Sequence, residues 1–136
     1  MAGFTFAYRL SGGMPTIQDL LFKDTETITK GDLVNLESGE IDLGATNDTA
    51  FVGVALETKA GTDSTTRLKC ITDFDAVYSV VDNNARAIGA TLDISGATGA
   101  QTVTTTSNAD FLVVADSSAT EPTLVRVNTG EHWLNQ

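Results

Sequence analysis

Phe51-Val52-Gly53-Val54-Ala55-Leu56 is the longest unbroken apolar run near the middle of this 136-residue chain. It is too short for an ordinary helix, it contains β-branched residues, and polar stretches bound it on both sides (45–49 and 57–66). A short apolar run between turn signals predicts a strand that is buried on both faces. Gly53 inside the run predicts a bulge, or a neighbouring backbone that passes too close for a side chain. We therefore expect a central strand on which the other strands pair or pack.

Short β-prone segments, separated by turns rich in Gly, Ser, Thr and Asn, fill the rest of the chain. No helical period is long enough to compete with them, so the pattern predicts an all-β fold, either a small antiparallel β-barrel or a β-sandwich. Residues 17–136 would form a single β domain. A Gly-containing turn at 37–40 predicts a hairpin, and Asn84 is a candidate cap for a single helical turn. The later strands are expected at 67–72, 75–81, 88–94, 102–105, 111–115 and 123–127.

The N-terminal segment alternates between apolar and other residues with the period of a strand. Gly12-Gly13 and the nearby Pro15 then predict a turn or a hinge. Two interpretations remain open: a first strand that pairs within its own domain, or an extended arm that adds to the edge of a neighbour's sheet. In the second interpretation residues 1–16 form the arm with its Gly-Gly hinge, and its binding side consists of Phe4, Phe6, Tyr8 and Leu10.

Eighteen acidic residues against eight basic ones give a formal net charge of -10. This charge argues against a nucleic-acid partner, because phosphate contacts are made mainly by Lys and Arg, and against binding to an anionic membrane. The start of the chain has no basic and apolar leader, and no run approaches the length of a membrane span. We therefore expect synthesis in a reducing cytoplasm. Cys70, the single cysteine, is expected to face the core as a small apolar residue.

No set of residues predicts catalysis, a metal site or a cofactor. His132 is the single histidine and lies close to the end of the chain, which is a poor scaffold for a Ser-His-Asp set. The nearest carboxylate pair, Asp73 and Asp75, is explained by turn formation, and the acidic residues around it lack the spacing of a calcium-binding loop. We expect Asp73, Asp75, Asp82 and Asp93 to lie on a solvated acidic face. The sequence thus favours a structural or binding protein rather than an enzyme.

Trp133 stands near the C-terminus, where a solvated indole ring would be costly. We expect it to pack against the body of the domain or to contact another subunit.

Several short apolar phrases follow one another in a fixed order: Lys30-Gly31-Asp32-Leu33-Val34, a Gly-turn hairpin, Phe51 to Ala55, Ala87 to Ile94, and Leu124 to Val127. Between Lys30 and Asn128 this order resembles the small capsid decoration, or cement, proteins of tailed bacteriophages. The resemblance implies a virion protein, often a homotrimer, that binds the outer surface of the assembled head. It would bridge subunits of the major capsid protein and stabilise the shell.

A second interpretation is a tail- or fibre-associated β module that binds a glycan or receptor on the host surface. Such a module would need exposed aromatic side chains in a groove, and Tyr78 and Trp133 are the candidates. Copy number separates the two interpretations, because a decoration protein is expected in hundreds of copies per particle and a tail module in a handful.

Overall fold

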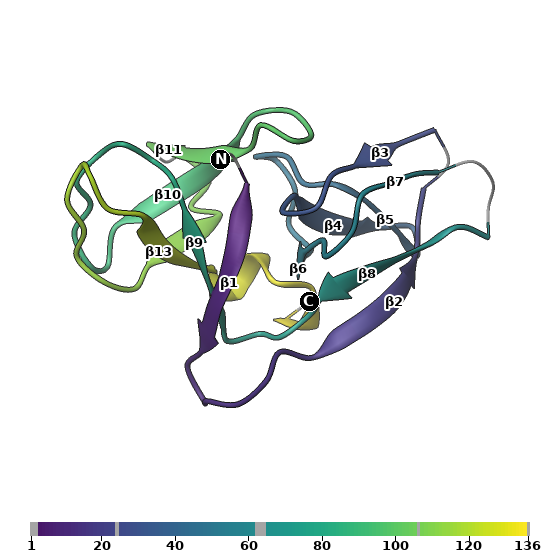
Figure 1. Ribbon diagram of the computed structural model, residues 1–136, viewed down its shortest axis with the longest axis horizontal. Coiled ribbons are helices and arrows are strands. Elements are labelled where there is room, and N and C mark those ends of the chain that lie inside the picture. Colours follow the sequence, from purple (N-terminus) through teal and green to yellow (C-terminus); the bar gives the residue numbers. More distant parts are fainter. Residues whose placement is uncertain (1–2, 24, 62–64, 106, 136) are drawn as a thin grey trace.

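The computed structural model describes residues 3–23, 25–61, 65–105 and 107–135, and strands make up nearly all of its regular structure. Figure 1 shows two halves: the six-stranded sheet lies on one side, the smaller sheets on the other, and β6 and the C-terminus lie between them. The elements are β1 (Phe4–Arg9), β2 (Ile17–Leu21), β3 (Thr27–Ile28), β4 (Leu33–Glu37), β5 (Glu40–Leu43), β6 (Phe51–Val54), β7 (Lys59–Ala60), β8 (Arg67–Ile71), β9 (Ala76–Val80), β10 (Thr91–Ser95), β11 (Thr102–Thr105), β12 (Phe111–Val113), β13 (Thr123–Val127) and the 3-10 turns η1 (Thr129–Glu131) and η2 (Trp133–Asn135).

All of the paired strands are antiparallel, and the larger sheet has the order β1-β9-β13-β12-β10-β11. The other half contains the ladders β5-β4-β6, β2-β8 and β3-β7. Within the described chain, isolated bridges join the end of β2 to β5 (Phe22 with Ile41) and the end of β6 to β8 (Ala55 with Cys70), in place of continuous pairing. The ladders therefore form packed, sandwich-like sheets and not a closed barrel. The all-β prediction is confirmed.

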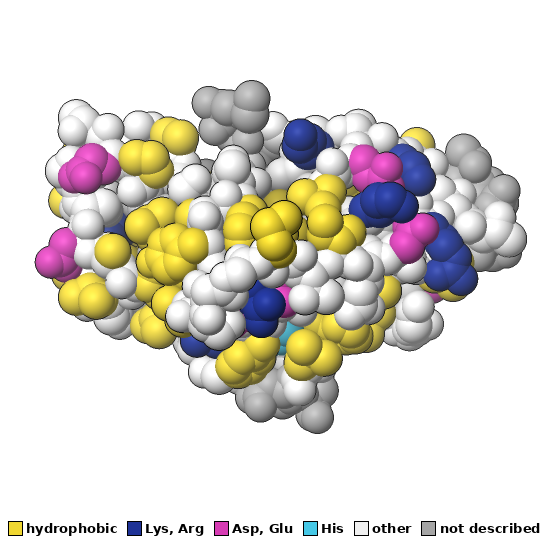
Figure 2. Space-filling view, turned by 60° about the horizontal axis from the view of Figure 1, so that its bottom comes forward, with side chains coloured by type: hydrophobic (Ala, Val, Ile, Leu, Met, Phe, Trp, Pro, Cys, Tyr) yellow, Lys and Arg dark blue, Asp and Glu magenta, His cyan; other side chains and the backbone are white. Residues whose placement is uncertain are grey.

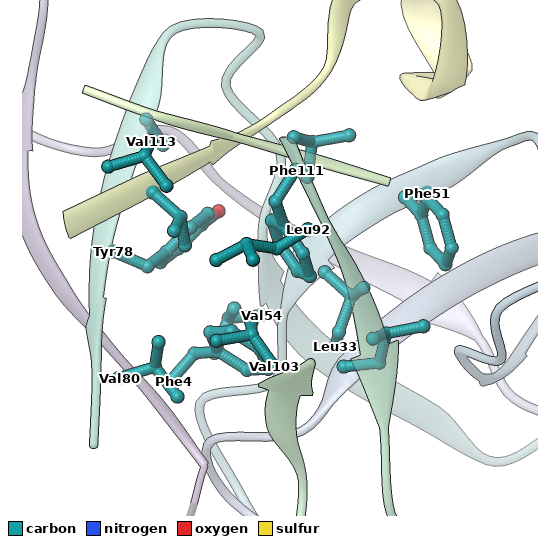
Figure 3. Packing of buried hydrophobic residues seen from close by; sticks show 14 of the residues in the cluster. Phe4, Leu33, Phe51, Val54, Tyr78, Val80, Leu92, Val103, Phe111 and Val113 are labelled. Carbon is teal, nitrogen blue, oxygen red and sulfur yellow. The ribbon is translucent and has the colours of Figure 1, made fainter. Parts of the chain in front are cut away.

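Strand β6 contributes to both hydrophobic cores. Phe51 and Val54 pack in the core of the six-stranded sheet, where Figure 3 shows them among residues of several strands. Val52 and Ala55, on the other side, pack in the second core with Phe22, Ile28, Val34, Ile41, Leu68 and Cys70. All four residues of β6 are buried, as predicted for this run. The strand lies at the end of its own three-stranded ladder, so its central position comes from packing rather than from pairing.

Gly53 confirms both predictions made from its place in the run. The register between β4 and β6 shifts at Val34, which leaves an extra residue on β6 as a bulge. The Gly53 backbone has a φ of 154°, and a Cβ atom there would lie 1.9 Å from the carbonyl oxygen of Ile71. Only glycine allows β8 to pass this close to β6.

The N-terminal segment is an edge strand of the protein's own sheet and not a free arm, which corrects the arm interpretation. β1 pairs with β9 from Phe4 opposite Val80 onward. Phe4 is 3% exposed, and its ring stacks on Phe111 with the centroids 5.1 Å apart. The physical reason is that the Phe4 ring is more stable when it is buried against apolar side chains of the six-stranded sheet than when it is exposed to water. Figure 3 shows Phe4 inside that core beside Val80.

The four apolar residues proposed for the arm do not share one face. A register shift between Phe6 and Tyr8 interrupts the alternation. Phe4 is buried and Phe6 is partly buried, whereas Tyr8 is 42% and Leu10 is 52% exposed. A bulge changes which side chains face the core, and strict period two therefore failed to predict their direction.

Three local predictions have different outcomes: one is confirmed, one is wrong and one is confirmed in part. The 37–40 turn joins β4 to β5 with positive φ at Ser38 and Gly39, as the Gly-containing hairpin predicted. The expected helical turn after Asn84 is wrong, because Arg86 forms a bridge with Ser117 and its guanidinium pairs with Asp82 at 2.5 Å. The expected 88–94 strand begins only at Thr91.

Candidate binding surface

The connection between β1 and β2 is tied to the body by two aspartates that follow β8. The backbone N–H of Thr16 donates to Asp73 Oδ2 at 2.6 Å, and that of Ser11 donates to Asp75 Oδ2 at 2.9 Å. Arg9 Nε donates to Asp75 Oδ1 at 3.0 Å and lies 3.5 Å from Asp73 Oδ1. The segment with Gly12 and Gly13 is therefore held at both ends, which a hinge would not be.

The electrostatics of Asp75 favour this attachment. Partial burial opposes its charged form, but hydrogen bonds from the Ser11 side chain and backbone and from Arg9 outweigh burial and lower the pKa to about 2. The folded pKa lies below the ordinary value of 3.8, so the contribution to stability is present above that value and is lost as the pH falls toward 2.

This connection and the C-terminus form an apolar surface. Leu10 is 52%, Met14 83%, Ile17 51% and Leu134 58% exposed. Both segments attach to residues 71–75: Ile17 pairs with Ile71, Leu10 N–H donates to Asp75, and Trp133 next to Leu134 donates to Thr72. Figure 2 turns this end of the molecule forward and shows apolar side chains across it. We call Leu10, Met14, Ile17 and Leu134 the apolar face.

The C-terminal residues that the sequence singled out lie against the body. Trp133 is partly buried on the second core, and its Nε1 lies 3.5 Å from the Thr72 carbonyl oxygen, which confirms the packing prediction. A contact with another subunit stays a prediction. His132 is 1% exposed and meets the Phe74 ring edge-on at 5.3 Å between centroids. Burial, followed by the charge of Arg126, lowers the pKa of His132 to about 4.

The expected solvated acidic face is wrong for three of its four members. Asp73, Asp82 and Asp93 are 8%, 8% and 5% exposed. Each accepts hydrogen bonds that fix a loop: Asp93, for example, accepts from the backbone N–H groups of Asn108 and Ala109 at 3.0 and 2.9 Å. Bonds from backbone amides compensate for the burial of Asp73 and Asp93, and bonds from the Arg86 guanidinium compensate for the burial of Asp82. In the described part of the chain, no three His, Cys, Asp or Glu side chains lie close enough together to hold a metal ion.

Two other candidates lie inside the protein. Tyr78 is 1% exposed, so it cannot line an aromatic groove on the surface, and this corrects its assignment as a glycan-binding residue. Cys70 is buried in the second core, as predicted, and burial raises the pKa of its thiol to about 12.

Two buried carboxyl groups give a test of the pH dependence of stability. Burial, as the largest cause, raises the pKa of both Asp42 and Asp110 to about 6. A raised carboxyl pKa adds stability that is present at low pH and is lost as the pH rises through about 6. His132 acts in the opposite direction. Because its pKa in the folded protein is lowered, it reduces the stability of the fold as the pH falls below 6.5, the ordinary pKa of histidine. The dependence of wild-type stability on pH therefore combines opposing effects, and a variant that lacks one carboxyl group isolates the contribution of that group.

For Asp110→Asn, we expect the free energy of unfolding relative to the wild type to fall by about 1–2 kcal/mol between pH 7 and pH 5. Asparagine keeps an oxygen for the Ile94 amide, which donates to Asp110 at 3.0 Å, but it cannot take up the proton. Urea unfolding at both pH values measures this change. Asp19→Asn, at an exposed carboxylate, is the matched control for the altered charge. An equal change in both variants would contradict the assignment to Asp110.

No protein-family model matches the chain, and no curated protein matches it. None of the helices in the described ranges is both long and apolar enough to cross a membrane.

Three of the four residues of the apolar face carry no motif in the sequence that would have predicted them. Met14, Ile17 and Leu134 were not singled out, because they are far apart in the chain and none belongs to a motif. One signal was present: Met14 stands between Gly13 and Pro15, where a turn leaves a large apolar side chain few ways to reach the core.

Proposed function

We propose that this protein is a capsid decoration protein of a tailed bacteriophage. In this proposal it binds the outer surface of the head as a homotrimer, bridges subunits of the major capsid protein and stabilises the shell. The order of apolar phrases between Lys30 and Asn128 motivates the assignment. The observation that carries a binding role is the apolar face, whose four members are each more than half exposed.

An exposed cluster of large apolar side chains favours an interaction role, because a soluble monomer gains nothing from keeping it in water. The attachment of the β1–β2 connection to Asp73 and Asp75 means that this face is already ordered before it meets a partner. A shell presents the same surface many times, so modest contacts of each subunit add up when the protein is itself oligomeric. A net charge of -10 keeps the unbound protein soluble.

The contact residues differ from those of the arm interpretation. Phe4 supports the fold from inside the core, and Phe6 packs against that core, so neither is free to grip a neighbour. Tyr8 and Leu10 remain exposed. We therefore assign the shell contact to Leu10 with Met14, Ile17 and Leu134, and we place Tyr8 at its margin.

The experiment that tests the proposal is co-sedimentation with heads that lack the protein. The double variant Leu10→Asp/Met14→Asp is expected to bind heads at least about tenfold more weakly than the wild type, because two charges would enter an apolar contact. Ile88→Asp is the control, since Ile88 is 63% exposed but lies outside the apolar face. Wild-type binding by the double variant would reject the apolar face, and failure of the wild type itself to bind would reject the decoration function.

A thermal test addresses the stabilising role. Heads without the protein are expected to release their DNA at a lower temperature than complete heads, and added protein should restore the difference. Equal release temperatures would contradict a cement role. The tail-module alternative keeps only Trp133 of its two aromatic candidates, and a count of a few copies per particle would favour it.

A further inference from the structure

A groove lies beside the outer edge of β1, and none of the four members of the apolar face lines it. Its volume is ≈ 540 Å³. Phe4 and Phe6 of β1 form one wall, and Val54 and Leu56 at the end of β6 form another. Ile71 at the end of β8 contributes to the apolar lining, and Lys30 lies at the turn before β4. The groove is large enough for two or three side chains of a bound ligand.

The outer edge of β1, beside this groove, has no strand partner in the described chain. β1 is the terminal strand of its sheet and has β9 on one side only. The N–H of Phe4 donates to the Gly31 carbonyl oxygen at 2.8 Å, so it points away from β9. Backbone groups two residues apart on a strand point the same way, and the N–H and C=O of Phe6 therefore face outward as well. No described strand pairs with β1 on that side. Such an edge is a template for an added strand.

Lys30 provides a charge at the same groove. Its side chain is exposed, and its backbone N–H donates to Thr58 Oγ1 at 2.9 Å, which fixes the turn. Its ammonium group forms no ion pair with any residue that the structure describes, whereas Lys23, Lys59 and Lys69 each have an acidic partner. An unpaired cation next to an apolar groove, on a chain of net charge -10, is complementary to an anionic group of a ligand.

We propose that this groove binds an extended peptide segment that adds to β1 as an edge strand. The segment would pair with the N–H and C=O of Phe6, place alternate apolar side chains between Phe6 and Leu56, and direct an acidic side chain toward Lys30. The free backbone edge favours a peptide over a lipid or another small amphiphile, which could use the apolar walls but not the strand groups. This inference concerns the ligand class of the groove and does not depend on the capsid assignment.

The test uses the full-length protein and a capped heptapeptide, Glu-Thr-Leu-Thr-Leu-Thr-Thr, with nuclear magnetic resonance as the readout. Saturating peptide is expected to shift the amide signals of Phe4, Phe6, Lys30 and Leu56, and to slow hydrogen exchange at the Phe6 amide by about tenfold or more. The same peptide with N-methyl groups on the two leucines keeps its side chains but cannot donate a hydrogen bond from either leucine amide, which is the edge that would face β1. Its binding should be lost. Equal binding by both peptides, or shifts confined to the apolar face, would overturn the proposal.

Variants at Lys30 test the charge. Lys30→Glu is expected to weaken peptide binding at least about twofold, and Lys30→Arg should preserve it. Lys69→Glu is the control, because Lys69 is exposed, carries the same charge and does not line the groove. Equal weakening by Lys30→Glu and Lys69→Glu would remove the assigned role of Lys30. Decanoate serves as a small amphiphile: if decanoate binds the groove and the peptide at millimolar concentration does not, the peptide proposal is wrong.

Discussion

Gly53→Ala is expected to destabilise the protein by more than about 3 kcal/mol, enough to leave little of it soluble. The added Cβ would lie 1.9 Å from the Ile71 carbonyl oxygen and 2.9 Å from the Tyr78 hydroxyl oxygen. The first neighbour is backbone, so no side-chain rotation relieves the overlap. β6 would have to separate from β8, and both cores would lose packing. Urea unfolding, or the soluble yield where unfolding is complete, measures the effect.

The matched control is Gly39→Ala in the turn between β4 and β5. Gly39 also has a positive φ, 81°, but nothing lies within 4 Å of its Cβ position. Its substitution is expected to cost about 1–2 kcal/mol, which is the cost of the backbone conformation alone. If the two variants lose the same stability, the close passage of β8 past Gly53 is not the reason for the glycine.

Phe4→Ala is the second substitution with a large expected effect, about 3–5 kcal/mol. It removes a ring that is 3% exposed and stacked on Phe111, and it leaves a cavity in the core of the six-stranded sheet. Tyr8→Ala, on the same strand, is expected to change stability by less than about 1 kcal/mol because Tyr8 is 42% exposed. Chemical denaturation of both variants measures the difference.

These two variants also decide between the interpretations of the N-terminus. A free arm would lose no stability when Phe4 is truncated, whereas an edge strand must. Unchanged unfolding of Phe4→Ala would restore the arm interpretation. For the same reason, deletion of β1 is a poor test of shell binding, since it would expose Phe111 and damage the fold.

Local sequence patterns predicted those parts of the fold that local forces determine. The apolar run with Gly53 and the β4–β5 hairpin depend on neighbours in sequence and on backbone conformation, and both are confirmed. The docking of β1 depends on Phe111, more than one hundred positions away, and on a bulge before Tyr8. Neither leaves a signal in the alternation of residues 4–10, so the sequence left two interpretations open there.

The candidate surfaces were harder to predict for the same reason. Asp73 and Asp75 were identified as turn residues, but the amides that they bind belong to Ser11 and Thr16, 64 and 57 residues away. The apolar face joins Leu10 to Leu134 across nearly the whole chain. Composition predicts that acidic residues are solvated, and here long-range hydrogen bonds to backbone amides reverse that expectation.

The division of β6 between the two cores has a consequence for how the molecule unfolds. Loss of either half would uncover one side of this strand, so neither half retains a complete interior when the other is lost. The chain should then behave as one cooperative unit with a single transition, and the amides of β6 should be among its slowest to exchange with solvent. Cleavage of the chain between β8 and β9 would leave β1 with the strands of the other half, so neither of the two fragments should fold alone.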